Sequence, residues 1–376
     1  MKIIIIGGSI GGLCAGIALQ EKGHQVTVYE RSPGDMKDRG AGLVIQPDLM
    51  DYLIEKGIAP REVFGVPATQ RQVLDSNGHA ALIYPNDTIF TSWNYLWRRL
   101  KNFFPFANYL SGFELERVSR TNGSVSAIFK NGEERTADLL IGADGFNSLV
   151  RAYVAPDIHP HYAGYVAYRG LIPESELSKE EVAFFGDKFS IYPYENSHLL
   201  CYLVPGPNGE LTEGKRLYNW VWYQNKTQEE LSILLTDKNG LKRDFTVPAG
   251  FLSHLNQEAL KLNALEKLPP ILRNRVLQTA QPFVQVILDM AVPQMYKGNI
   301  ALLGDAASLV RPHTASGTAK AYRDAITLAM CLEEYPDMQT ALHYWNAQQL
   351  RHAKALTIHG QQLAASSQLG LSGSKK

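Results

Sequence analysis

The first thirty residues constrain the fold more than any other segment of the chain. An apolar run, KIIII at residues 2–6, is followed by the glycine-rich turn GGSIGG at 7–12. Residues 10–22 then have the composition of a helix that ends at Gly23, and QVTVY at 25–29 indicates a second strand. A strand, a glycine turn, a helix and a second strand in this order predict the βαβ unit that opens a dinucleotide-binding domain.

The glycine turn departs from the usual G-x-G-x-x-G pattern because Ser9 stands in place of the middle glycine. Gly7 permits the tight turn, and Gly12 lets the helix pack closely against the strand. Ser9 is small enough for a pyrophosphate to approach, and its hydroxyl can bond a phosphate oxygen. Glu30 follows Gly12 at close to the spacing of the acid that binds ribose hydroxyls. We therefore predict a bound dinucleotide, the alternative being a glycine turn that holds no ligand.

The composition excludes several classes of protein. The 37 Lys and Arg residues balance 37 Asp and Glu residues, which argues against a bulk nucleic-acid binder. Cys14, Cys201 and Cys331 lie far apart without metal-binding spacing, so we expect neither a disulfide framework nor a metal site. The uncharged residues 3–19 resemble a signal peptide, but their glycines favour a strand, turn and helix. We expect a cytoplasmic protein without a membrane span, either a monomer or a homodimer.

Aromatic, alternating segments fill residues 164–224, including GYVAYRGLI, KFSIYPY, HLLCYLVP and NWVWYQ. They predict an antiparallel sheet with one face on a core or a cavity. The other elements that we expect are helices at 47–57, 91–104, 316–334 and 339–365, a hairpin around Asn77-Gly78 within 70–85, a helical region at 228–273 and a buried strand at 298–303.

Two later motifs each place an aspartate after a buried strand. The segment DLLIGADGFNSLVR delivers Asp144, and GNIALLGDAASLVRPHTASGTAKAYRDA delivers Asp305. A carboxylate such as Asp305 at a strand end can bind a sugar or ribityl hydroxyl. The backbone N–H groups of residues 315–318 would point at whatever lies before the following helix. Taken singly, each motif could be an ordinary strand followed by a loop.

Together, GGSIGG, ADGFNSLVR and GDAASLVRPHTASG resemble the three motifs of the group A flavoprotein monooxygenases, the para-hydroxybenzoate hydroxylase-like superfamily. The segments GGSI, GYVAYRG, NWVWY and RPHTASGTAKA are similar to its 2,6-dihydroxypyridine 3-hydroxylase branch. The resemblance implies an α/β fold: a Rossmann-like FAD domain of the glutathione reductase type, an interleaved antiparallel-sheet substrate domain and C-terminal helices. The boundaries that we expect are 1–70, 100–163 and 280–335 for the FAD domain, 71–99 and 164–279 for the substrate domain, and 336–376 for a helical tail.

The same resemblance implies the cofactors. FAD would be bound permanently without a covalent link, NADPH or NADH would visit transiently, and O₂ would be the co-substrate. A C4a-hydroperoxyflavin would then hydroxylate a small electron-rich ring, such as a hydroxylated pyridine. The family often has an arginine where this chain has Trp93. The candidate FAD-binding residues are Gly7, Ser9, Ile10, Gly12, Glu30, Arg31, Arg39, Arg98, Asp144, Asp305, Pro312, Ala315, Ser316, Gly317 and Thr318.

The substrate site is the least determined part of the prediction. His313 could orient or deprotonate a phenol-like substrate, or it could be a loop histidine with a backbone partner. Arg169 could bind substrate or pin the sheet. The candidate catalytic residues are His313, Arg311 and Tyr192, and the candidate pocket residues are Gln46, Tyr194, Tyr202 and Trp222. The aromatic residues among them could instead simply pack the sheet.

Three other functions remain open. A monooxygenase of a larger polyketide such as tetracycline would share the fold and the cofactor. A flavin-dependent halogenase would need W-x-W-x-I-P, and here Gln224 and Asn225 replace Ile-Pro. A flavin-binding sensor or carrier would keep all three motifs without turnover.

Overall fold

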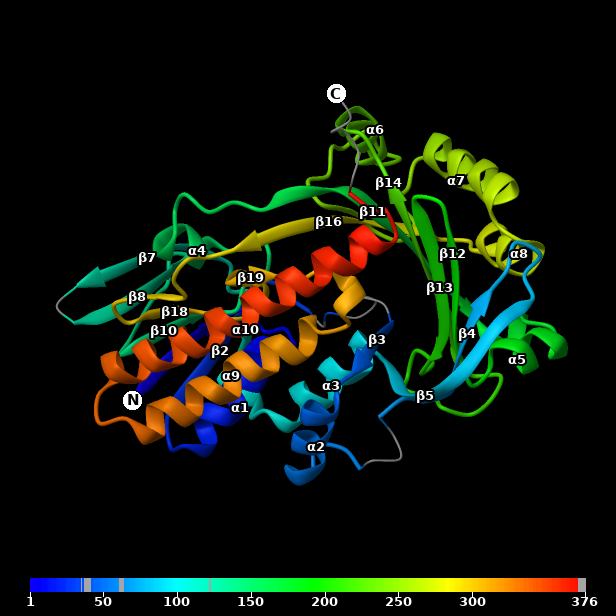
Figure 1. Cartoon of the computed structure of the whole chain (residues 1–376). Helices are drawn as coiled ribbons and strands as arrows, with labels where there is room; N and C mark the ends of the chain where they lie inside the picture. The colour runs from blue at the N-terminus through cyan, green and yellow to red at the C-terminus, as the bar shows by residue number, and fades with distance from the viewer. Residues whose placement is uncertain (35, 37–41, 61–63, 122, 371–376) are drawn as a thin grey trace.

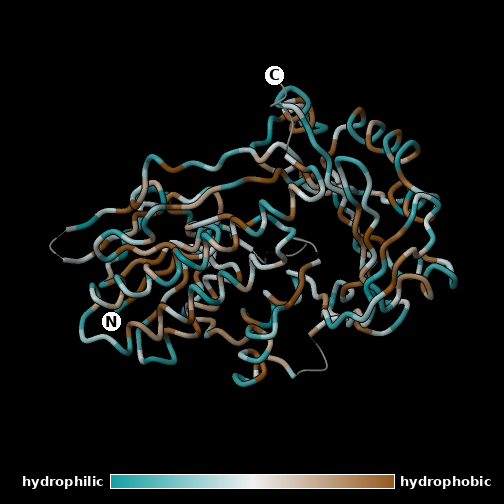
Figure 2. Tube along the Cα trace, viewed as in Figure 1, coloured by the Kyte–Doolittle hydropathy of each residue, from teal (hydrophilic) through white to brown (hydrophobic). Residues whose placement is uncertain are grey.

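The computed structural model describes residues 1–34, 36, 42–60, 64–121 and 123–370. Two large sheets organise the chain and occupy opposite halves of the molecule (Figure 1). Two long strands, β11 and β16, extend from one half into the other. In Figure 2 the apolar segments gather where the strands and helices of each half pack together.

The first sheet contains the predicted βαβ unit. In spatial order its strands are β17 (Tyr296–Lys297), β18 (Ile300–Leu302), β10 (Leu139–Gly142), β1 (Lys2–Ile6), β2 (Gln25–Glu30) and β6 (Tyr109–Ser111). All neighbours are parallel except β17 and β18. The isoleucines of β1 are buried, as the continuous apolar run predicted. Because β1, β10 and β18 are adjacent and parallel, the three motifs that follow them meet at one edge of the sheet.

Helices cover this sheet and join the two halves. α1 (Ile10–Glu21) packs against α9 (Gly317–Glu334), and α10 (Met338–Ser366) packs on α9 and reaches toward the second sheet (Figure 1). These three helices confirm the predicted ones within one or two residues. A small sheet of β7 (Leu115–Thr121), β8 (Ser124–Phe129) and β9 (Glu134–Ala137) packs against β1 and β10. The remaining helices of this half are α2 (Pro47–Glu55), α3 (Trp93–Phe103) and α4 (Leu149–Val154).

The second sheet is the predicted antiparallel sheet, with one parallel pair, β12 with β4. Its strands in spatial order are β15 (Thr246–Val247), β16 (Phe283–Ala291), β11 (His161–Pro173), β14 (Leu217–Asn225), β13 (Ser197–Val204), β12 (Lys188–Tyr194), β4 (Val66–Leu74), β5 (Ala80–Ser92) and β3 (Gly42–Ile45), with β19 (Ser308–Leu309) beside β16. The predicted helical region at 228–273 corresponds to α6 (Gln228–Leu234), α7 (His254–Lys267) and part of α8 (Pro270–Gln278), interrupted by β15.

The two faces of this sheet have different environments. One face carries an apolar core with Trp220 and Trp222, which α6, α7 and α8 help to cover. The other face carries Tyr165, Tyr202 and Tyr223 and contacts the loop before α9. Side chains alternate between these faces along each strand.

Sheet membership also bears on the proposed domain boundaries, which stay a prediction. Strands β3 and β16 both belong to the second sheet, where β3 pairs with β5 and β16 pairs with β11 and β15. Their residues nevertheless fall in ranges that we assigned to the FAD domain. Helix α3 packs against α1, although most of it falls in the range assigned to the substrate domain. Within the described ranges, no helix combines the length and apolar character that crossing a membrane requires.

Candidate active site

The glycine turn after β1 is held by close backbone packing. Gly7 has φ +106°, and a Cβ atom there would lie 2.3 Å from the carbonyl oxygen of Ala143. A Cβ atom on Gly12 would lie 1.9 Å from the carbonyl oxygen of Gly7. Both positions therefore require glycine. Ser9 is the N-cap of α1, but its side chain makes no capping hydrogen bond, so its hydroxyl is available to a phosphate.

Glu30 lies at the end of β2 and is buried against this turn. Its carboxylate accepts hydrogen bonds from the backbone N–H groups of Gly8 and Ser32, each at 2.9 Å. The carbonyl oxygen of Gly8 in turn accepts bonds from the Trp97 indole at 3.0 Å and the Tyr109 hydroxyl at 3.1 Å. Glu30 thus orders the glycine turn itself. Each carboxylate oxygen keeps a second lone pair, which can accept from a ribose hydroxyl.

The second motif links two parts of the site. Asp144 stabilises the start of α4, whose N-cap is Ser148, because its carboxylate accepts from the Ser148 hydroxyl at 2.5 Å and from Leu149 N–H at 2.8 Å. Burial raises the pKa of Asp144. Arg151, also buried, donates to the carbonyl oxygen of Ala306 in the third motif. Both side chains have a structural role here, and a direct contact between Asp144 and the cofactor stays a prediction.

Asp305 lies on a turn directly after β18. Its side chain is exposed, yet it lies deep enough among protein atoms that desolvation raises its pKa. An exposed carboxylate in a desolvated position is typical of the floor of a concave site. No described residue donates a hydrogen bond to this carboxylate, which leaves it free to accept from a hydroxyl of the ligand.

A buried ion pair that the sequence analysis missed fixes the turn beside Asp305. Lys320 and Asp324 on α9 are 1% and 0% exposed, and their charged groups lie 2.8 Å apart. Lys320 donates to the carbonyl oxygen of Gly304 at 3.0 Å, and Asp324 accepts from Gly304 N–H at 2.9 Å. The only available signal was an opposite-charge pair at i and i+4, a spacing that is usually solvent-exposed.

The loop before α9 presents backbone donors. Ala315 adopts the left-handed conformation, with φ 51°, and its carbonyl oxygen accepts from the Gln46 side chain at 3.1 Å. Ser316 does not cap the helix with its side chain, and no described residue accepts a hydrogen bond from the N–H groups of Gly317 and Thr318 in the first turn. The nearest atom to a Cβ on Gly317 would be 3.8 Å away. The helix therefore begins at open space, as a site for a flat ring requires.

His313 lies on the short 3₁₀ turn that Pro312 opens, against the second sheet. Its Nε2 atom lies 2.9 Å from the Tyr165 hydroxyl oxygen. Its ring centroid lies 4.3 Å from that of Tyr223 and 5.2 Å from that of His198. The structure thus surrounds His313 with three side chains that the sequence analysis did not select. The alternation of residues along β11, β13 and β14 indicated that these side chains share one face of the sheet. It did not indicate which loop covers that face.

Both histidines of this group are neutral at neutral pH. Burial, together with His198 and Arg311, lowers the pKa of His313 to about 3. Burial and the charge of Arg71 lower the pKa of His198 to about 4. An imidazole with such a low pKa is a poor base for a phenol, since general bases work best with a pKa near the operating pH.

Arg311 is occupied by an ion pair. Its guanidinium donates to both carboxylate oxygens of Asp289 on β16, at 2.8 and 2.5 Å. It also lies 5.5 Å from the ring centre of Tyr165. The hydrogen bonds to Asp289 are the main reason that the pKa of Arg311 is raised. Arg311 therefore ties the loop before α9 to the second sheet, and its charge is already paired.

Three predicted site residues lie on the opposite face of the sheet. Trp222 donates to the hydroxyl oxygens of Tyr194 and Ser197 at 2.9 and 3.1 Å, and Tyr192 stacks on Tyr194. Tyr192 and Trp222 belong to the apolar core of that face, and Tyr194 packs against it. These three side chains lie on the face opposite His313. From the sequence we had instead proposed Tyr192 as a catalytic residue and Tyr194 and Trp222 as pocket residues. The alternation of strand residues identified two faces, and the sequence did not show which face met the loop.

Tyr202 lies on the same face as His313, but its polar end is engaged. Its hydroxyl donates to the carbonyl oxygen of Gly42 at 3.1 Å, and its ring stacks on Phe90. Arg169 donates to the same carbonyl at 3.3 Å and to the side chain of Gln285 at 3.1 Å. Both side chains anchor β3 to the sheet, which supports the pinning role for Arg169.

The remaining candidates for FAD binding lie in different environments. Ile10 is buried in α1, and Arg31 is exposed. Arg98 donates to the carbonyl oxygen of Pro207, and Arg39 lies outside the described residues. Trp93, in the place of the family arginine, stacks on Trp97.

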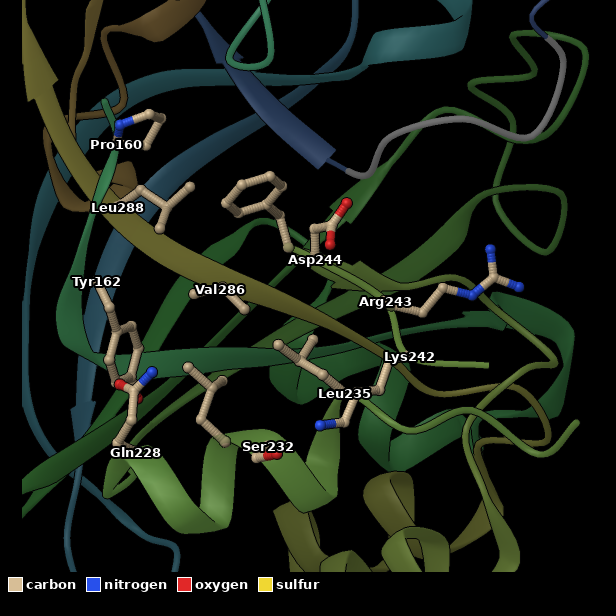
Figure 3. Close-up of a pocket in the computed structure, with 12 residues that line it drawn as sticks. Pro160, Tyr162, Gln228, Ser232, Leu235, Lys242, Arg243, Asp244, Val286 and Leu288 are labelled. Atoms are coloured by element: carbon tan, nitrogen blue, oxygen red, sulfur yellow. The ribbon is translucent and has the colours of Figure 1, made fainter. Parts of the chain in front are cut away.

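A pocket of about 380 Å³ lies apart from this site (Figure 3). It is lined by Tyr162, Phe245, Val286 and Leu288 together with residues of α6. Val286 and Leu288 belong to or pack against the core on the face opposite His313. The pocket therefore does not provide access to the ring of His313.

Comparison with known proteins agrees with this geometry. A family described as FAD binding domain-like matches residues 162–289, and one described as an NAD(P)-binding Rossmann-like domain matches residues 5–34. The chain is 34% identical to a 2,6-dihydroxypyridine 3-monooxygenase of Paenarthrobacter nicotinovorans, over 98% of this chain and 92% of the relative. The chain belongs to the FAD-dependent monooxygenases.

Within that family, the chain is similar to monooxygenases named for dihydroxypyridine and hydroxynicotinate. The chain superposes on the structure of 2,6-dihydroxypyridine-3-hydroxylase from Arthrobacter nicotinovorans with a TM-score of 0.92, covering 98% of this chain and 92% of the other. It is 27% identical to 6-hydroxynicotinate 3-monooxygenase of Pseudomonas fluorescens, over 89% of this chain and 83% of the relative. This chain is accordingly an FAD-dependent aromatic hydroxylase.

The residues present fit FAD. The glycine turn and the uncapped Ser9 suit its pyrophosphate, Glu30 suits the ribose, and Asp305 suits a hydroxyl of the ribityl chain. The free N–H groups at the start of α9 suit the ring edge that becomes negatively charged on reduction. FAD, when bound, supplies the electron transfer and the oxygen chemistry.

Proposed function

We propose that this protein hydroxylates a small aromatic ring that carries ionisable oxygen substituents, such as a hydroxylated pyridine. NADH or NADPH would be the reductant and O₂ the co-substrate. The observation that carries the proposal is the polar aromatic group around His313. Tyr165, Tyr223 and His198 surround this imidazole on the sheet face that meets the start of α9.

The chain's own residues have two tasks in this reaction. The N-terminal N–H groups of α9 favour negative charge before the helix, because the helix dipole and the unpaired donors act in the same direction. The side chains around His313 hold a planar ring, since Tyr223 offers an aromatic face and His313 offers a ring nitrogen. His198 and Tyr223 are buried, which keeps bulk water from the group of side chains around His313.

A small heteroaromatic ring fits the group of side chains around His313 better than a polyketide does. Tyr202 and Arg169 close the same face toward β3 through their bonds to Gly42. The relatives named for dihydroxypyridine and hydroxynicotinate act on single rings, which supports the same substrate size here. A flavin-binding sensor that catalyses no reaction would not need hydrogen-bonded polar side chains at the place where a substrate ring would bind.

We also propose that the protein works in the cytoplasm. Its three cysteines are free and buried, so a reducing compartment suits it, and the reductant that we propose is an intracellular nucleotide. Burial raises the pKa of Cys14 and Cys201 to about 12, so neither thiol is reactive at neutral pH.

Oxidation of NADH and NADPH by the FAD-loaded protein tests the proposal. We expect 2,6-dihydroxypyridine or 6-hydroxynicotinate to accelerate this oxidation and to gain one oxygen atom by mass spectrometry. Tetracycline is the comparison substrate. Acceleration by tetracycline alone would favour the polyketide alternative. Reduction that no aromatic compound stimulates would favour a sensor or carrier.

A further inference from the structure

The hydrogen bond between Tyr165 and His313 determines which nitrogen of the imidazole carries the proton. Tyr165 is fully buried, and burial raises the pKa of its hydroxyl, so that it keeps its proton. A buried hydroxyl needs an acceptor, and leaving its proton unpaired would cost about 1–3 kcal/mol. The Nε2 atom of His313 is the acceptor within reach, at 2.9 Å. Nε2 is therefore unprotonated, and the proton of the neutral imidazole lies on Nδ1.

The Nδ1 atom of His313 makes no hydrogen bond to a described residue, and it is not among the fully enclosed polar atoms that lack a partner. The Nδ1 atom of the neighbouring His198, in contrast, is enclosed. His313 therefore presents an N–H donor, not a lone pair, to a molecule beside the loop before α9.

The groups that face His313 keep it in this form. They are Tyr165 on β11, His198 on β13, Tyr223 on β14, and Arg311 paired with Asp289 on β16. From α10, Gly360 contacts this loop and carries no charge. Arg311 and His198 both disfavour a positive charge on His313, which stays neutral from acidic to basic pH.

We propose that Tyr165 holds His313 as the Nδ1–H tautomer, so that His313 donates a hydrogen bond to an anionic oxygen on the substrate ring instead of accepting its proton. This inference rests on the proposed function and deepens it, because it names the bound species. The ring would lose its proton to bulk water before it binds. Tyr165 is then a positioning residue, and the site selects rings that are acidic enough to be anions at neutral pH.

The first test needs no substrate. The ¹⁵N spectrum of histidine-labelled, FAD-loaded protein distinguishes protonated from unprotonated ring nitrogens. The chain has 10 histidines, so the His313 signals are assigned by comparison with His313→Gln. We expect an unprotonated Nε2 and a protonated Nδ1. A protonated Nε2 in the parent protein would overturn the inference.

Two matched tyrosine variants identify the cause. Tyr165→Phe should shift His313 toward the other tautomer or a mixture, because the donor to Nε2 is lost. Tyr223→Phe removes a hydroxyl from the other tyrosine whose ring contacts His313, and it should leave the His313 signals unchanged. An equal change in both variants would mean that ring packing and not the hydrogen bond sets the tautomer.

The second test measures binding of the ring. The dissociation constants of 2,6-dihydroxypyridine and 6-hydroxynicotinate are obtained from the flavin absorbance between pH 5 and 9. We expect binding to tighten as each compound loses its proton, with a midpoint that follows the compound, and Tyr165→Phe to weaken binding about tenfold, as for one hydrogen bond to a charged group. A midpoint shared by both compounds would contradict the inference. Failure of both to bind would refute the proposed substrate class, while the ¹⁵N result would still decide the tautomer.

Discussion

The ammonium group of Lys320 lies 2.8 Å from the carboxylate of Asp324, and the two groups bind the backbone C=O and N–H of Gly304, respectively. Both side chains are fully buried. This pair connects α9, whose N-terminus faces the flavin site, to the turn that carries Asp305. One ion pair therefore sets the relative position of two of the parts that hold the cofactor.

We expect Lys320→Met to destabilise the protein by about 3–5 kcal/mol, because it leaves Asp324 buried and unpaired. The exposed pair of Lys261 and Glu258 is the matched control, and Lys261→Met should cost less than about 1 kcal/mol. Denaturant unfolding of the FAD-saturated proteins measures both. The double variant Lys320→Met with Asp324→Leu should recover part of the loss. Equal losses from the two single variants would show that burial adds nothing to the Lys320 pair.

Asp305→Ala should weaken FAD binding by about 1.5–3 kcal/mol, as for a hydrogen bond to a charged group. The dissociation constant is measured by flavin fluorescence after removal and re-addition of FAD. Asp157→Ala is the control, since Asp157 is exposed and belongs to none of the three motifs. An unchanged FAD affinity in the Asp305 variant would mean that this carboxylate does not contact the cofactor.

His313→Ala should slow hydroxylation at least about tenfold, as for the loss of one hydrogen bond to a charged group. The cause is loss of the hydrogen bond to the ring, so more NAD(P)H should be consumed with release of H₂O₂ instead of product. Product and H₂O₂ are quantified against NAD(P)H, with His359→Ala on the exposed surface of α10 as the control. Because the pKa of His313 is about 3, the parent protein should show no ionisation of His313 between pH 5 and 9. If the variant still couples NAD(P)H consumption fully to product formation, His313 does not belong to the substrate site.

The buried histidines should make the protein sensitive to acid. The pKa of His198 is about 4 in the folded protein and near 6.5 when the chain unfolds, so the unfolded state binds more protons between these values. Stability is therefore constant with respect to this group above about pH 6.5, and it falls by roughly 1.4 kcal/mol per pH unit below that. His198→Gln should reduce the loss between pH 6.5 and 5 in denaturant unfolding, whereas His79→Gln, on the exposed hairpin, should not. An acid response that is the same in both variants and the parent would sink this explanation.

Local patterns in the sequence determined the first half of the fold. Residues 2–30 alone predicted β1, α1 and β2 within one residue, because four consecutive isoleucines, a glycine turn and a capped helix leave few alternatives. The sequence also predicted that Gly7, Asp144 and Asp305 each follow a buried strand, and the parallel pairing of β1, β10 and β18 brings the three motifs to one edge of the sheet.

The substrate side depended on tertiary structure. Alternation along β13 and β14 separated Trp222 from Tyr223, but both faces of this sheet are aromatic, so no local property showed which one met the loop before α9. The side chains that now define the site, Tyr165 and His198, are brought to His313 from strands far away in the chain. The low pKa values of the two histidines arise from this burial and from neighbouring charges, and the pairing of Arg311 with Asp289 arises from contact between β16 and the loop. Such contacts depend on how the two sheets pack, which the spacing of residues along one strand or helix does not encode.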